Sequence, residues 1–172
     1  MELSNSILPA AALMMAALFA YPTDAAAQTK EGTWKGTYSA FGTSKATAIG
    51  KDRLLLVFDE NGLVTTDGDG IFDHTTWHCW GLGDFTSGVG NAHGYCVGND
   101  PTGDQAVLNF ADEKHPLDQK IVKGSFTFTG GTGKYAGITG TASYTSDGAM
   151  FKTTEKGTYV GHTTNEGAYK LP

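Results

Sequence analysis

Several features that are common in other protein classes are scarce in this sequence. The 172 residues include two cysteines and five prolines, and 12 lysines and arginines stand against 18 acidic residues. The resulting net charge of −6 argues against nucleic acid or an anionic membrane surface as a partner, because both bind basic patches. Beyond residue 27 no apolar run is long enough to span a bilayer as a helix. We therefore expect neither a nucleic-acid partner nor stable membrane insertion.

The motifs of the common enzyme classes are also missing. The sequence contains no Gly-x-Ser-x-Gly elbow and no His-Glu-x-x-His zinc motif. The segment ending at Lys134 is no P-loop, because Phe128 replaces its first glycine and Tyr135 follows the lysine. No window has the i, i+3, i+4, i+7 apolar spacing of an amphipathic helix. No cofactor is therefore expected.

The first 27 residues are predicted to be a secretory signal peptide. Residues 8–20 form an apolar core too short to cross a bilayer, and the small residues Ala25 and Ala27 fit the cleavage rule. The segment before this core lacks Lys and Arg, so an uncleaved anchor or a misassigned start are the alternatives. Cleavage would leave residues 28–172 as one domain in the periplasm or outside the cell.

Patterns typical of β-strands fill the remainder of the chain. Short segments rich in Gly, Asp, Asn and Pro separate them, and Asn61-Gly62 predicts a hairpin turn. Eight or nine short strands without long helices predict an all-β fold, either an antiparallel barrel or a sandwich. The expected strands are residues 34–40, 53–58, 63–66, 71–80, 92–97, 105–110, 121–129, 139–145 and 149–160.

The glycine-rich segment 129–144 carries a family resemblance. Its sequence, Thr-Gly-Gly-Thr-Gly-Lys-Tyr-Ala-Gly-Ile-Thr-Gly-Thr-Ala-Ser-Tyr, resembles the GGTGxFxxAxG signature of allene oxide cyclases and dirigent proteins. The resemblance implies a single calycin-like antiparallel β-barrel of about eight strands around a hydrophobic cavity, and a homotrimer. It identifies no catalytic residue. Two further motifs, His93-Gly-Tyr-Cys96 and Asp100-Pro-Thr-Gly-Asp104, are similar to segments of small exported bacterial proteins of unknown role.

The two cysteines, Cys79 and Cys96, are expected to form a disulfide in an oxidising compartment. Closing a loop of about 17 residues contributes roughly 3 kcal/mol by the chain-entropy relation. A pair of metal thiolates and two inert buried thiols are the alternatives.

Residues 73–96 are the segment richest in reactive side chains. On an extended strand, His74, His78 and Trp80 share one face and Cys79 the other. If the cysteines bond across neighbouring antiparallel strands, Tyr95 lies opposite Trp80. His93 then joins the histidine face. This predicts a cluster with a catalytic role inside the cavity, made of His74, His78, His93 and Tyr95.

The imidazoles of this cluster would transfer protons and the phenol would stabilise an oxyanion. Strand alternation adds Trp34, Tyr38 and Trp80 as ligand-binding residues. Alternatively, the histidines lie on the outer face, or bind zinc or copper if the strands bend.

We expect an exported barrel that binds a small hydrophobic or aromatic molecule. Whether it is a carrier or a cofactor-free isomerase, cyclase or lyase remains open at this point. The alternative function is a non-enzymatic protein of the cell envelope, with a filled barrel that binds partners at its rim.

Overall fold

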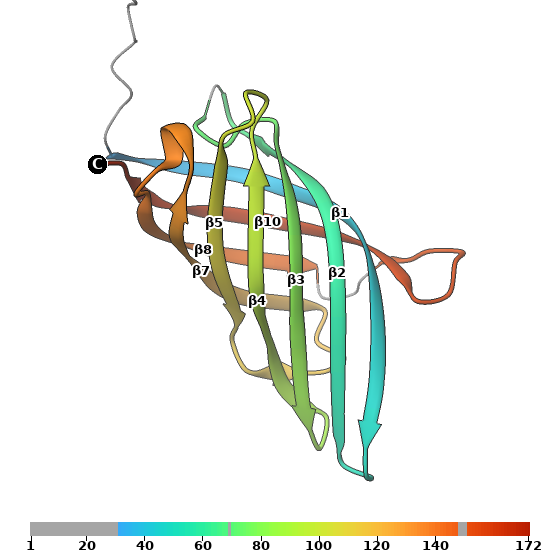
Figure 1. The fold of residues 1–172 in the computed structure, drawn as a ribbon. Helices are drawn as coiled ribbons and strands as arrows, with labels where there is room; N and C mark the ends of the chain where they lie inside the picture. Colours follow the sequence, from blue (N-terminus) through green and yellow to red (C-terminus); the bar gives the residue numbers. More distant parts are fainter. Residues whose placement is uncertain (1–30, 69, 148–150) are drawn as a thin grey trace, which may run out of the picture.

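The protein folds into a closed antiparallel β-barrel. The computed structural model describes residues 31–68, 70–147 and 151–172, so the predicted signal peptide lies outside the described residues. Figure 1 shows the long strands β1 to β4 along one side and β7, β8 and β10 along the other. The elements are β1 (Glu31–Ile49), β2 (Arg53–Thr66), β3 (Thr75–Thr86), β4 (Val89–Asn99), β5 (Gln105–Asp112), β6 (His115–Pro116), β7 (Ile121–Gly131), the 3₁₀ helix η1 (Gly133–Tyr135), β8 (Thr139–Asp147), β9 (Phe151–Lys152) and β10 (Thr158–Lys170).

Eight long strands form the barrel wall in the order β1-β2-β3-β4-β5-β7-β8-β10, and β1 pairs with β10 to close it. Each of these eight strands pairs with two neighbours, and the β1–β10 pairing extends from Glu31 to Thr43 of β1. The two-residue strands β6 and β9 pair with β4 and β10. The predicted all-β barrel of about eight strands is confirmed. In the part of the chain that the structure describes, no helix is both long and apolar enough to cross a membrane.

One expected turn is absent. Asn61-Gly62 predicts a hairpin, yet β2 runs without interruption from Arg53 to Thr66. Gly62 instead lies beneath the Tyr38 ring, where an added Cβ would be 2.5 Å from Cε2 of that ring. The actual β1–β2 turn is at residues 50–52, where Gly50 has a φ of 65°. The glycine thus provides space for an aromatic ring instead of a turn.

Buried aromatic and aliphatic side chains form a hydrophobic core cluster around Phe72 and Tyr135. The segment resembling the cyclase and dirigent signature forms η1 here and buries Tyr135 completely. The Tyr135 hydroxyl donates a hydrogen bond to the Ile71 carbonyl at 2.7 Å, and its ring stacks on Phe72 with centroids 5.6 Å apart. Ile138 is also almost fully buried. The signature therefore contributes Tyr135 and Ile138 to the hydrophobic core.

The Asp-Pro-Thr-Gly-Asp turn holds this signature segment in place. The Asp100 carboxylate pairs with the Lys134 ammonium group, while the Lys134 backbone N–H donates to Asp104 Oδ2 at 3.0 Å. Burial alone would raise the pKa of Asp100, but hydrogen bonds from Lys134, Thr102 and the Asp104 backbone lower it to about 2. At Gly133, with φ 51°, an added Cβ would overlap the Asp104 carboxylate. The two motifs thus form one interlocked unit.

Candidate functional site: an aromatic cavity with acidic groups

The barrel contains a cavity of about 500 Å³ that is partly open to solvent. This volume is within the range of small-molecule sites. Most of its wall is apolar, and polar side chains occur at a few positions. The described lining residues are Trp34, Tyr38, Leu56, Phe58, Glu60, Val64, Trp77, Cys79, Phe85, Ala92, Cys96, Leu108, Phe110, Asp112, His115, Leu117, Gln119, Val122, Phe126, Tyr144, Ser146, Asp147, Tyr159, Thr163 and Asn165.

The disulfide forms part of this wall. Cys79 and Cys96 are directly opposite each other on β3 and β4, and their sulfurs are 2.07 Å apart. Both residues are buried and line the cavity. The predicted disulfide and the predicted pairing of Trp80 with Tyr95 are confirmed.

The predicted orientation of this strand pair is wrong, because the disulfide faces inward. Thr75, Trp77 and Cys79 form the buried face of β3, and Trp80 on the other face is 41% exposed. Tyr95 is 53% exposed. The apolar face of a strand turns toward the barrel interior, and in β3 that face carries Trp77, Cys79 and Phe85. Trp80 therefore does not line the cavity.

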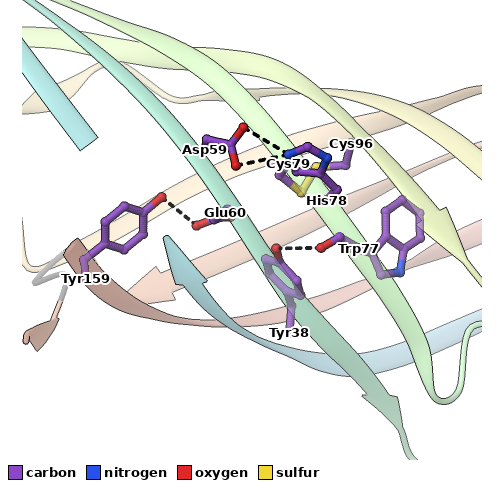
Figure 2. The surroundings of a disulfide bond; sticks show 8 residues. All are labelled: Tyr38, Asp59, Glu60, Trp77, His78, Cys79, Cys96 and Tyr159. Atoms are coloured by element: carbon purple, nitrogen blue, oxygen red, sulfur yellow. Dashed lines mark hydrogen bonds and ion pairs between the residues drawn. A yellow bond between two sulfur atoms is a disulfide. The ribbon is translucent and has the colours of Figure 1, made fainter. Parts of the chain in front are cut away.

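The three histidines of the predicted cluster also lie outside the cavity. His74 precedes β3 with a φ of 54°, so strand alternation does not reach it, and it pairs with Asp73. His78 Nε2 is 3.0 Å from Asp59 Oδ2 on the outer face, where Figure 2 shows this pair. His93 is exposed and lies opposite Leu82. A catalytic role for these histidines stays a prediction that their positions do not favour.

Trp34 and Tyr38 do line the cavity, as alternation along β1 predicts. Both side chains are about nine-tenths buried. The indole N–H groups of Trp34 and Trp77 are buried without an acceptor among the described residues. Buried donors are normally paired, so these two indole N–H groups are exceptions within the described residues.

Glu60 is an acidic group of the cavity wall that sequence reasoning missed. The Tyr159 hydroxyl donates to Glu60 Oε2 at 2.9 Å, as Figure 2 shows. The Tyr38 hydroxyl interacts with Glu60 as well and donates to the Trp77 carbonyl at 3.4 Å. Burial raises the pKa of Glu60, and the two phenols offset part of that increase. Because its pKa is raised, the Glu60 carboxylate takes up a proton more readily than an exposed glutamate does.

A second acidic group, Asp112, lies at the end of β5. The Tyr144 hydroxyl donates to Asp112 Oδ1 at 2.5 Å, and the Ala92 N–H donates to Oδ2 at 3.2 Å. His115 Nε2 is 3.3 Å from Oδ2, while His115 Nδ1 is 2.7 Å from the Pro116 carbonyl. Since a carbonyl only accepts, Nδ1 carries a hydrogen. The other ring nitrogen, His115 Nε2, faces the Asp112 carboxylate.

Glycines on intervening strands allow both tyrosines to reach their carboxylates. Gly42 of β1 pairs with Tyr159 on one side and with Glu60 on the other. A Cβ at Gly42 would be 2.5 Å from Cζ of the Tyr159 ring. Gly124 lies in the same way between Tyr144 and Asp112, and a Cβ there would be 2.2 Å from Cζ of Tyr144. Each tyrosine therefore crosses a glycine strand to hydrogen-bond a carboxylate two strands away.

A predicted turn concealed one of these acids. The predicted hairpin at residues 59–62 interrupts the alternation of Leu56, Phe58, Glu60 and Val64 on one face, whereas β2 is continuous. Read as one strand, that pattern places Glu60 among apolar side chains, which is the signal for a buried acid.

Metal ligands are dispersed: within residues 31–68, 70–147 and 151–172 no three His, Cys, Asp or Glu side chains form a metal-binding group.

Together, the fold and the cavity define a closed antiparallel eight-stranded β-barrel with space for a small molecule inside. The pterocarpan synthase dirigent protein GePTS1 has a similar structure, with a TM-score of 0.48 and 12% identity over 83% of this chain and 88% of that one. For the pterocarpan synthase dirigent protein PsPTS1, the TM-score is 0.43 and the identity 10%, over 83% of this chain and 96% of that one. The sequence matches no family model and no curated protein.

Proposed function

We propose that the protein binds a small, largely hydrophobic or aromatic molecule inside its barrel. The observation that carries this proposal is the cavity of about 500 Å³, whose wall is mainly aromatic and aliphatic with a few convergent polar groups. Binding sites for small molecules have this composition. A filled barrel that acts only as a structural protein of the cell envelope fits less well, because packed interiors leave few voids larger than a water molecule.

The same cavity supports a second candidate function, cofactor-free proton transfer in an isomerase, cyclase or lyase. The supporting observation is the set of titratable groups on its wall. Glu60 has a raised pKa because it is buried, and Asp112 Oδ2 lies 3.3 Å from His115 Nε2. Groups of this kind suit general acid–base catalysis. The candidates for catalysis are therefore cavity residues, and the outer histidines are not among them.

We also propose export to an oxidising compartment, periplasmic or extracellular. A closed disulfide between Cys79 and Cys96 supports this location, since cytosolic thiols are normally kept reduced. Assembly into a homotrimer is proposed from the sequence resemblance alone, and analytical ultracentrifugation of the exported protein would test it.

Native mass spectrometry of the exported protein tests the binding proposal. We expect an added mass that disappears on denaturation. Ala92→Phe adds a ring to the cavity wall and should remove that mass. Ala111→Phe adds the same ring to an exposed position on the neighbouring strand and should retain it. An added mass retained equally by both variants would place the molecule on the surface and contradict the proposal.

A further inference from the structure

The charges that line the cavity are predominantly of one sign. Glu60, Asp112 and Asp147 contribute carboxyl groups, and none of the described lining residues is a lysine or an arginine. His115, the histidine of the described wall, is already engaged with Asp112 and with the Pro116 carbonyl. A carboxylate enclosed by apolar side chains is costly unless a cation or hydrogen bonds compensate it. Within the described wall, tyrosine hydroxyls provide part of that compensation, and no lysine or arginine adds to it.

Glu60 is the acid best placed to meet a bound molecule. It lies on β2 between Phe58 and Val64 of the cavity wall, one strand away from the disulfide at Cys79. Its side chain is half-buried, so it is partly open. Beside it, Gly161 leaves space, since a Cβ at that glycine would be 3.8 Å from Glu60 Oε2. The carboxyl group therefore has free volume next to it inside an apolar chamber.

The surrounding wall is made of aromatic rings. Phe58 and Phe110 lie with their centroids 6.0 Å apart, and the Tyr159 hydroxyl donates to Glu60 Oε2. Aromatic faces attract cations through their quadrupole, most strongly where water is excluded. A carboxylate among aromatic faces is a combination that recognises a positively charged nitrogen on an apolar body.

We infer that the molecule bound in the barrel is a hydrophobic amine or another organic cation, with its charged nitrogen at Glu60 and its apolar body against the aromatic wall. Asp112 provides the second negative group further along the cavity. An anionic molecule of the same size would meet like charges without a lysine or arginine from the described wall to pair with. This inference rests on the proposed function, because it names the chemical class of ligand for the same cavity.

A displacement assay with three matched compounds tests the inference. The probe is N-phenyl-1-naphthylamine, a fluorescent molecule that is uncharged at pH 7.5. Competitors are 2-(2-naphthyl)ethylamine, 2-(2-naphthyl)ethanol and 2-naphthylacetate, which share one ring system and carry positive, zero and negative charge. We expect the amine to displace the probe at a concentration at least tenfold lower than the alcohol, and the acid to be weakest.

Matched variants assign the preference to the cavity. The preference for the amine is the displacing concentration of the alcohol divided by that of the amine. Glu60→Gln should reduce this ratio about tenfold, and Asp112→Asn should reduce it as well. Asp59→Asn and Glu113→Gln make the same chemical change at exposed neighbouring positions and should leave the ratio unchanged. Far-ultraviolet circular dichroism identifies any variant that does not fold, and the two cavity variants serve as substitutes for each other.

The outcomes separate the two proposals. The amine inference is overturned if the probe binds but the three compounds displace it equally, if none of them displaces it, or if the alcohol or the acid is preferred. Each of these results leaves the binding function intact. An amine preference that persists in both cavity variants also overturns it. Failure of the wild-type protein to bind the probe at all counts against the binding function itself.

Discussion

The aromatic rings inside the barrel lie over glycines of neighbouring strands, and Gly98 gives the clearest test of this arrangement. Gly98 on β4 is the register partner of Trp77 on β3. A Cβ added at Gly98 would be 2.6, 2.7 and 2.8 Å from three atoms of the Trp77 indole. Carbon atoms in contact are normally 3.5–4.0 Å apart, so Gly98→Ala must displace the ring that forms the cavity wall.

The cost of Gly98→Ala follows from this overlap. Overpacking of a filled interior costs about 1–3 kcal/mol, and we expect a loss of about 2 kcal/mol in the free energy of unfolding. Gly161→Ala is the matched control, because the nearest atoms to a Cβ there are 3.8 and 4.0 Å away. The control should change stability by less than about 0.5 kcal/mol. Urea unfolding of the oxidised protein, followed by tryptophan fluorescence, measures both.

A double-mutant cycle identifies the indole as the obstacle. Trp77→Leu is destabilising alone, but it removes the atoms that a Cβ at Gly98 would meet. In that background Gly98→Ala should cost less than about 0.5 kcal/mol, so that the coupling approaches 2 kcal/mol. The reasoning would be refuted if Gly98→Ala cost no more than Gly161→Ala, or cost the same with and without the indole.

Three further predictions concern charged and exposed groups. Glu60→Gln should stabilise the protein at pH 7. The pKa of Glu60 is raised in the folded state, so its full contribution to stability is present below the unfolded-state pKa and is lost as the pH rises through the folded-state pKa. Urea unfolding should show that the difference in stability between variant and wild type vanishes near pH 3, and a variant less stable than wild type at pH 7 would contradict this reasoning. Asp100→Asn should cost about 1–2 kcal/mol at pH 7, since the folded pKa of about 2 gives stability that is lost only as pH falls from about 4 through 2. If the free energy of unfolding of Asp100→Asn fell between pH 4 and pH 2 as steeply as that of the wild type, the result would be inconsistent with the Asp100–Lys134 pair. His78→Ala, at an exposed site, should change stability by less than about 0.5 kcal/mol and leave probe binding unaltered. Loss of probe binding in this variant would show that His78 is part of the binding site.

Much of the fold could be read from the sequence because strand alternation and glycine-rich breakers are local signals. The disulfide and the register of β3 against β4 followed from the positions of Cys79 and Cys96. Which face of that pair turns inward did not follow, since Trp77 and Trp80 lie on opposite faces and both are apolar. The inward choice depends on the summed apolar area of the whole strand, including Phe85 beyond the expected end at residue 80.

The polar part of the site was harder to predict because it depends on pairing across three strands. Tyr144 and Asp112 are 32 residues apart, and Tyr159 and Glu60 are 99 apart. No spacing in one sequence indicates such a contact, and the glycine between the partners resembles a turn signal. Gly62 shows this ambiguity directly, since it lies in the middle of β2 under an aromatic ring.

Saturable binding of an apolar probe inside the barrel is the measurement that tests the central claim most directly. N-phenyl-1-naphthylamine should bind the wild-type protein and Ala111→Phe with one site per chain. Binding should weaken at least tenfold in Ala92→Phe, because Ala92 lines the cavity and Ala111 is exposed. Absence of saturable binding to the wild-type protein, or equal binding by the two variants, would contradict the claim that the barrel is a small-molecule site.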